Sequence, residues 1–198
     1  MLFRSAQSTA FQNGQFPPIE HIVYTSATQG DYWIAIQRFR ATRRVRLDLS
    51  VTIDYNLEHQ VPGESIVPPG DSRDAITVGA VEPETLNLRP YSSQGPTKDS
   101  RTKPELVAPD RVSTATYGPQ GFIGTSAAAP FAAGVAALIT GARPGITPVA
   151  VRAMLLQRAA GPGAKAMNNQ VGAGYVALGD LPTTLALPFV VRGASLPP

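Results

Sequence analysis

Apolar and polar residues alternate strictly from Val45 to Ile53, which is the period of a β-strand with one buried face. Two earlier apolar segments, residues 32–39 and 21–24, are separated from it and from one another by turn-sized polar stretches. Three short strands joined by turns are typical of an antiparallel meander. We therefore predict a β-rich subdomain over residues 19–66, preceded by a flexible lead-in at residues 1–18.

The pattern changes to that of an α/β domain over residues 67–180. Short apolar runs at residues 76–81 and 104–109 are typical of parallel strands that are buried on both faces. A helix is predicted to begin near Ser126. A second helix is predicted from Thr147, a typical helix cap followed by proline, to Gly161.

The overall composition suits a folded protein of modest size. The chain has 198 residues, and its 43% content of hydrophobic residues can supply a buried core. It contains no cysteine, so neither disulfides nor thiolate metal sites are expected. No run of eighteen apolar residues is present, which argues against a membrane span. The N-terminus lacks the apolar core of a signal peptide, and residues 181–198 are expected to form an extended tail.

Ser126 is the leading candidate for chemistry. It stands among small residues, in Gly-Thr-Ser-Ala-Ala-Ala-Pro, immediately before an apolar helix. A helix N-terminus presents unpaired N–H groups and a partial positive charge, which suit the oxyanion formed in acyl transfer. A serine in this position can also act only as a helix N-cap. The motif alone leaves both interpretations open.

Four sequence blocks together resemble the subtilisin-like serine proteases (subtilases). The Gly-Thr-Ser motif at residues 124–130 resembles the nucleophile block of this family. Upstream, residues 75–81, 91–97 and 103–110 read Ala-Ile-Thr-Val-Gly-Ala-Val, Tyr-Ser-Ser-Gln-Gly-Pro-Thr and Lys-Pro-Glu-Leu-Val-Ala-Pro-Asp, and they follow the order of the family. The resemblance implies a partial subtilisin-like parallel-sheet domain, with the segment at 19–66 as an antiparallel β-rich insertion.

The resemblance implies that Ser126 is the catalytic nucleophile and that Thr125 flanks the oxyanion position. Subtilases place Asp first, His second and Ser last along the chain. No Asp-Thr/Ser-Gly, His-Gly-Thr or Gly-Asn block of the family precedes Ser126 here. The two histidines, His21 and His59, lack a flanking glycine, and we interpret both as structural. We expect the Asp and His of the triad to lie in a missing upstream part of the catalytic domain.

The remaining charged residues receive structural interpretations. Asp71 and Asp110 are predicted to be turn residues, and Asp74 has no histidine to orient. Five arginines surround the turn at residues 40–43, but no aromatic platform accompanies them, so we favour protection of a strand edge over nucleic-acid binding. No clustered Asp-x-Asp pattern is present, and we predict neither a metal site nor a cofactor.

The sequence therefore predicts a serine endopeptidase that hydrolyses peptide or protein substrates through an acyl-enzyme on Ser126. In subtilisin itself, loss of the serine or the histidine alone lowers the rate on the order of a millionfold, so this chain alone is expected to be nearly inactive. The alternative is a non-catalytic, decayed homologue or a β-rich binding module. No partner among nucleic acids or membranes is expected. The compartment stays open, because secretion would need a signal upstream of Met1.

Overall fold

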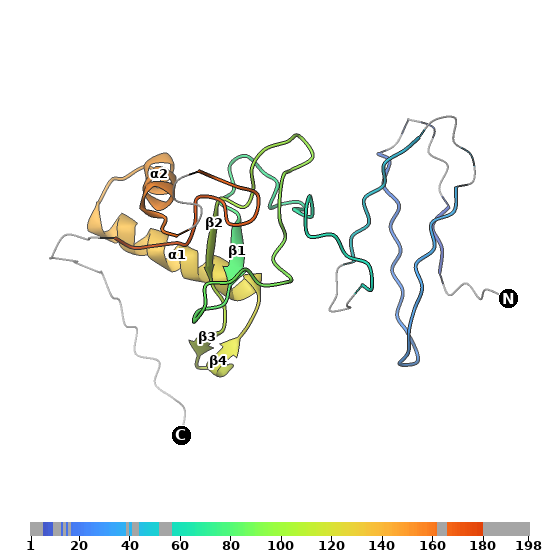
Figure 1. The fold of residues 1–198 in the computed structure, drawn as a ribbon, viewed down its shortest axis with the longest axis horizontal. Helices are drawn as coiled ribbons and strands as arrows, with labels where there is room; N and C mark the ends of the chain where they lie inside the picture. The colour runs from blue at the N-terminus through green and yellow to red at the C-terminus, as the bar shows by residue number, and fades with distance from the viewer. Residues whose placement is uncertain are drawn as a thin grey trace, which may run out of the picture. The chain divides into compact units, whose positions relative to one another are not determined.

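The computed structural model divides the chain into two compact units, Met1–Tyr55 and Asn56–Pro198, and each is considered by itself. The structure describes residues 6–9, 13, 15, 17–38, 40, 44–51, 57–161 and 166–179. All its helices and strands within these residues belong to the second unit, which also carries Ser126 (Figure 1). The predicted tail at 181–198 and most of the predicted lead-in lie outside the described residues.

The centre of the second unit is a pair of parallel strands. β1 (Val78–Val81) pairs with β2 (Leu106–Pro109) in the register Val78 to Leu106. Both strands were predicted from their short apolar runs. Residues 174–176 pair with the edge of β2 that faces away from β1. The Val107 N–H donates to the Gly174 carbonyl (3.0 Å), and the Val176 N–H donates to the Val107 carbonyl (2.8 Å).

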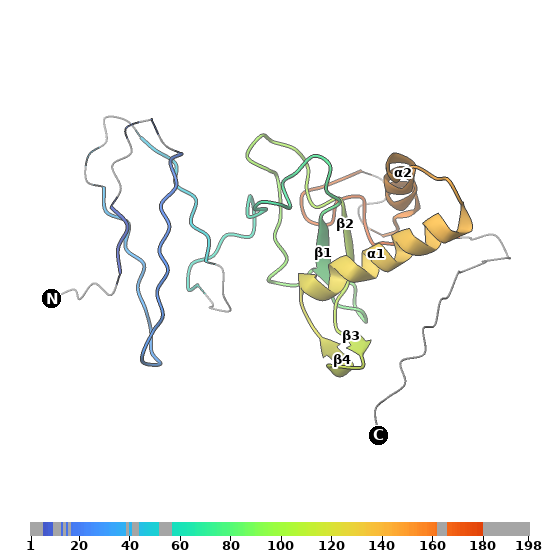
Figure 2. The same cartoon turned by 180° about the vertical axis from the view of Figure 1, so that it is seen from behind.

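Two helices cover this strand pair. α1 (Thr125–Ala142) lies across β1 and β2, and α2 (Pro148–Arg158) packs beside the later turns of α1 (Figure 2). Small side chains allow the close approach of α1, since its buried alanines pack directly on alanines of the two strands: Ala80, Ala108, Ala128 and Ala132. A second cluster of larger side chains joins β2, α1 and α2 through Leu106, Ile139 and Leu155.

Both predicted helices are present. α2 begins as expected, with the Thr147 side chain accepting a hydrogen bond from the Ala150 N–H (3.3 Å) and proline in the first turn. Among the described residues, α1 is the one helix long and apolar enough to cross a membrane by length and composition alone. Core helices of soluble proteins meet the same criteria, and α1 packs on β1, β2 and α2.

A β-hairpin between β2 and α1 was missed from the sequence. β3 (Val112–Thr114) pairs antiparallel with β4 (Gly118–Phe122), and the rings of Tyr117 and Phe122 stack with centroids 5.0 Å apart. The two strands are short, largely exposed and rich in glycine and polar residues, so no apolar alternation marks them. The hairpin lies near the start of α1 (Figure 1).

A buried ion pair ties the residues just before β2 to α2. Lys103 and Glu105 have side chains only 2% and 3% exposed, and their charged atoms lie 2.7 Å apart. Arg152 of α2 also contacts the Glu105 carboxylate at 2.7 Å, and the Thr77 N–H donates to the same carboxylate (2.8 Å). Pairing from several sides compensates the cost of removing these charges from water.

The predicted antiparallel meander in the first unit is not confirmed. In residues 17–38 and 44–51, the structure assigns no strand. Large apolar side chains in these residues are exposed, among them Trp33 at 84% and Leu47 at 64%. The alternation of apolar and polar residues is present in the sequence, but the described residues carry no ladder of strand hydrogen bonds.

Candidate active site

Ser126 is the second residue of α1, and it is exposed. The N-cap of the helix is Gly124, which makes no side-chain capping bond. The interpretation of Ser126 as a helix cap is therefore wrong, and its hydroxyl is not committed to capping the helix. Among the described residues, the Ser126 side chain has no hydrogen-bond partner.

The backbone around Ser126 leaves hydrogen-bonding groups unused. The first four N–H groups of a helix have no partner within it, except where the cap carbonyl serves them. Here the Gly124 carbonyl accepts from the N–H groups of Ala127 (2.9 Å) and Ala128 (3.2 Å). Within the described part of the chain, the N–H of Ser126 stays available at the positive end of the helix.

Pro130 lies in the second turn of α1. A proline there has no N–H to donate to the carbonyl four residues earlier, which is that of Ser126. The carbonyl of Ser126 therefore lacks its usual helical donor, close to the hydroxyl.

Gly124 lies in the turn that leads into α1. Its backbone has φ 110° and ψ 172°, a region that is reached essentially only by glycine. This conformation explains why the Gly-Thr-Ser motif begins with glycine. The Gly124 N–H donates to the carboxylate of Asp110, with 3.3 Å between the nitrogen and Oδ2.

Asp110 is not the turn residue that the sequence predicted. It follows β2 directly and is only 1% exposed. Its carboxylate lies 3.3 Å from Nε of Arg89 and accepts a hydrogen bond from the hydroxyl of Tyr91. Asp71, by contrast, lies in a turn as expected.

Arg89 and Tyr91 were not anticipated as partners of Asp110. Burial raises the pKa of Tyr91 above its usual range, and the hydrogen bond to Asp110 adds to this effect. The hydrogen bond from Arg89 to the Tyr91 hydroxyl (3.0 Å) raises the pKa of Arg89. One available signal was the place of Asp110, directly after a buried parallel strand, since functional residues often lie at the carboxyl ends of such strands.

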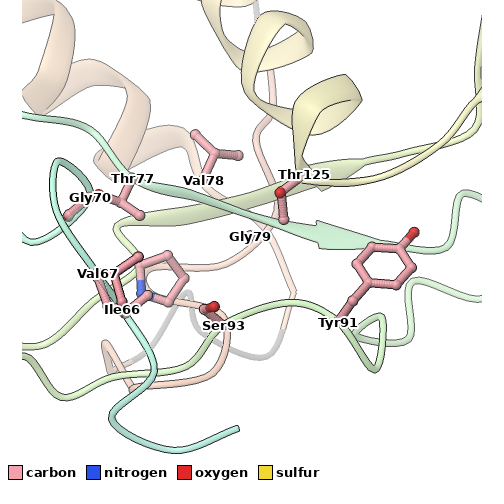
Figure 3. A pocket seen from close by; sticks show the side chains of 10 residues that line it. Ile66, Val67, Gly70, Thr77, Val78, Gly79, Tyr91, Ser93 and Thr125 are labelled. Atoms are coloured by element: carbon pink, nitrogen blue, oxygen red, sulfur yellow. The ribbon is translucent and has the colours of Figure 1, made fainter. Parts of the chain in front are cut away.

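Thr125 lines a cavity of about 180 Å³ beside β1. In Figure 3, Thr125 reaches the cavity from the start of α1, whereas Tyr91 and Ser93 line it from the segment that follows β1. The remaining lining residues are mostly small or apolar: Ile66, Val67, Gly70, Thr77, Val78, Gly79 and Pro104.

The described residues bring no general base to Ser126. His21 belongs to the first unit and His59 to the second, and both are exposed. Neither imidazole has a hydrogen-bond partner among the described residues. In the same residues, no group of three or more His, Asp or Glu side chains is placed to hold a metal ion.

Comparison with known proteins agrees with the motif. The sequence model of the Subtilase family matches residues 55–174, more than half of the chain. The chain is 31% identical over 115 residues to serine protease AprX of Bacillus subtilis (strain 168), covering 46% of this chain and 26% of that protein. It is also similar to the structure of the Clostridium perfringens CspB protease, with 26% identity and a TM-score of 0.50 over 59% of this chain and 28% of that chain. It thus spans about a quarter of the length of these relatives.

Proposed function

The chain belongs to the subtilase family, and from this premise we propose that it carries the nucleophile of a serine endopeptidase, the hydroxyl of Ser126. The observation that supports this role most directly is the state of Ser126 at the start of α1. Its side chain is exposed and makes no bond among the described residues, and its N–H is not used by the helix. A nucleophile and an oxyanion donor are thus offered by the same residue.

In the proposed reaction, Ser126 Oγ attacks the carbonyl carbon of a peptide bond and gives up its proton to a general base. The negative charge that develops on the carbonyl oxygen is stabilised by the Ser126 N–H, and Thr125 flanks this position. The base returns the proton to the leaving amine as the C–N bond breaks, which leaves an ester on Ser126. Water then hydrolyses the ester and releases the second product.

The base and the carboxylate that orients it are proposed to come from residues that precede this sequence in the full gene product. Two observations support this part of the proposal. No imidazole or carboxylate forms a hydrogen bond with Ser126 among the described residues, and the chain covers about a quarter of its relatives. The 198-residue chain by itself is then nearly inactive, and its natural substrates are peptides or proteins.

The test compares the 198-residue chain with the gene product that extends upstream of Met1, using a fluorophosphonate that labels activated serines. We expect labelling and peptide hydrolysis in the longer protein only. The Ser126→Ala variant of the longer protein should lose both, with kcat lowered on the order of a millionfold. Ser72→Ala removes another exposed serine and serves as the matched control, with unchanged labelling.

Two outcomes contradict the proposal in different ways. Rapid stoichiometric labelling of the 198-residue chain would show that it needs no upstream residues. Labelling of neither protein, with no hydrolysis, would favour the decayed, non-catalytic homologue.

A further inference from the structure

Asp110 is a buried carboxylate that the proposed reaction does not use. Its side chain is 0% exposed, and its backbone N–H donates to the Val81 carbonyl at the end of β1 (3.0 Å). The residue is therefore fixed to the ends of both parallel strands. Burial of a charge is costly unless other groups compensate it, so its partners carry information about its role.

Among the described residues, the contacts of the Asp110 carboxylate all involve one of its two oxygens, Oδ2. Oδ2 accepts from the Tyr91 hydroxyl and lies 3.3 Å from Nε of Arg89, which is itself paired with Glu82 (3.2 Å). The Tyr91 hydroxyl is the donor in this bond, and burial together with the bond raises the pKa of Tyr91 further above neutral. The other oxygen, Oδ1, is buried and has no hydrogen-bond partner among the described residues. The carboxylate is thus held in one orientation by groups on a single side.

Besides the Tyr91 hydroxyl, the Gly124 N–H also donates to Oδ2 (3.3 Å), 14 residues further along the chain. Gly124 stands two positions before Ser126, in the backbone conformation that essentially only glycine adopts. Its carbonyl is held by the N–H groups of Ala127 and Ala128. The N–H of Gly124 is therefore held by Asp110, and its carbonyl is held by the first turn of α1.

We propose that Asp110 is a positioning residue for the nucleophile: through the Gly124 N–H it fixes the turn into α1 and thereby the place of the Ser126 hydroxyl and N–H. The inference rests on the proposed function of Ser126. Without the carboxylate, the turn at Gly124 can rotate, and the reacting atoms spread over several positions. A misplacement of about 1 Å can lower a rate about a hundredfold, whereas substrate binding at a distance from the turn is little affected.

Glu105 offers a matched control for a purely structural role. It is also a buried carboxylate, 2% exposed, and it pairs with Lys103 and Arg152 at 2.7 Å. Among the described residues, none of its contacts involves the turn before α1. Removal of either carboxylate should lower the melting temperature, but only the loss of Asp110 should change the chemical step.

The experiment measures kcat and KM for a peptide substrate in the upstream-extended gene product, well below the melting temperature of each variant. We expect Asp110→Ala to lower kcat about a hundredfold, with KM changed by less than about threefold. Asp110→Asn keeps an oxygen that can accept from the Gly124 N–H, so this variant should lower kcat less than Asp110→Ala does. Glu105→Gln should keep kcat within about twofold. A kcat of Asp110→Ala within twofold of the parent, or an equal loss in Glu105→Gln, would overturn the inference.

A second measurement separates this inference from the proposed function. If the extended protein neither labels nor hydrolyses peptide, the proposed function fails, and the contact is then tested by amide hydrogen exchange in the 198-residue chain. Asp110→Ala, or Asp110→Asn if the alanine variant does not fold, should speed exchange at Gly124 at least about tenfold more than at Val107, which reports on global opening. Unchanged exchange at Gly124 would overturn the positioning role.

Discussion

Two regions of this chain carry strong apolar patterns, but among the described residues only one of them buries its large apolar side chains. In β1 and β2, residues such as Val81 and Leu106 are 0% exposed. In residues 17–51, Val23 and Trp33 are 77% and 84% exposed. An apolar pattern therefore identifies the side chains that a fold can bury, and burial itself depends on what covers them.

The strand pair β1 and β2 is covered by α1 and by a segment near the end of the described residues. The buried alanines of α1 lie on β1 and β2, and the segment around Gly174 closes the outer edge of β2. In the described residues of 17–51, there is no ladder of strand hydrogen bonds to align the alternating side chains on one face. A β-sheet face needs both the ladder and a covering layer before it contributes to stability.

The largest expected effect on stability contrasts one leucine from each region. Leu155, 1% exposed, packs with Leu106 and Ile139, and Leu155→Ala should lower the free energy of unfolding by about 2–5 kcal/mol. Leu47 is 64% exposed, so Leu47→Ala should change the free energy of unfolding by less than about 0.5 kcal/mol. Urea unfolding followed by circular dichroism measures both. A cost above about 1 kcal/mol for Leu47→Ala would mean that the first region is covered in solution.

A smaller effect is expected at the start of α2. Thr147→Ala removes the hydroxyl that accepts from the Ala150 N–H and should destabilise the protein by about 1 kcal/mol. Thr140 is the matched control, because its hydroxyl donates to the Ala136 carbonyl within α1 (2.9 Å) and has no other partner among the described residues. Thr140→Ala should be close to neutral in the same unfolding experiment. Equal costs for the two variants would show that the cap is not what stabilises α2.

The smallest effect depends on pH. Hydrogen bonds from Arg101, and then from Thr97, hold the pKa of the exposed Asp99 well below its usual range. Its ionised form therefore stabilises the folded state above about pH 4, and this contribution is lost as the pH falls through the lowered pKa. Asp99→Asn should lower the melting temperature at pH 7 by at most about 2 °C.

At pH 2, the melting temperatures of Asp99→Asn and the parent should approach each other. Asp31→Asn is the control from the first region, since Asp31 has no ion pair among the described residues. An Asp99→Asn difference that grows toward acid would contradict the sign of the linkage.

Much of the second unit could be predicted from local signals. The runs at residues 76–81 and 104–109, and the threonine–proline start of α2, determine elements over a few neighbouring residues. The hairpin at residues 112–122 gave no such signal, because exposed glycine and polar residues are typical of loops as well.

The candidate site could be predicted only in part. Ser126 and Thr125 stand in a recognisable motif, whereas the role of Asp110 depends on partners from separate parts of the chain: Arg89, Tyr91 and Gly124. An aspartate that follows the end of a short apolar run is most often a turn residue. Only the tertiary contact reveals that it is buried.

The backbone conformation of Gly124 also has a consequence for gene copies that are no longer under selection. A change of this glycine to any residue with a Cβ would strain the approach to the helix without touching the serine itself. A gene copy released from selection could therefore lose competence at position 124 while its serine codon stays intact. A survey of gene copies that scores this glycine together with the serine would distinguish maintained copies from relics better than the serine alone.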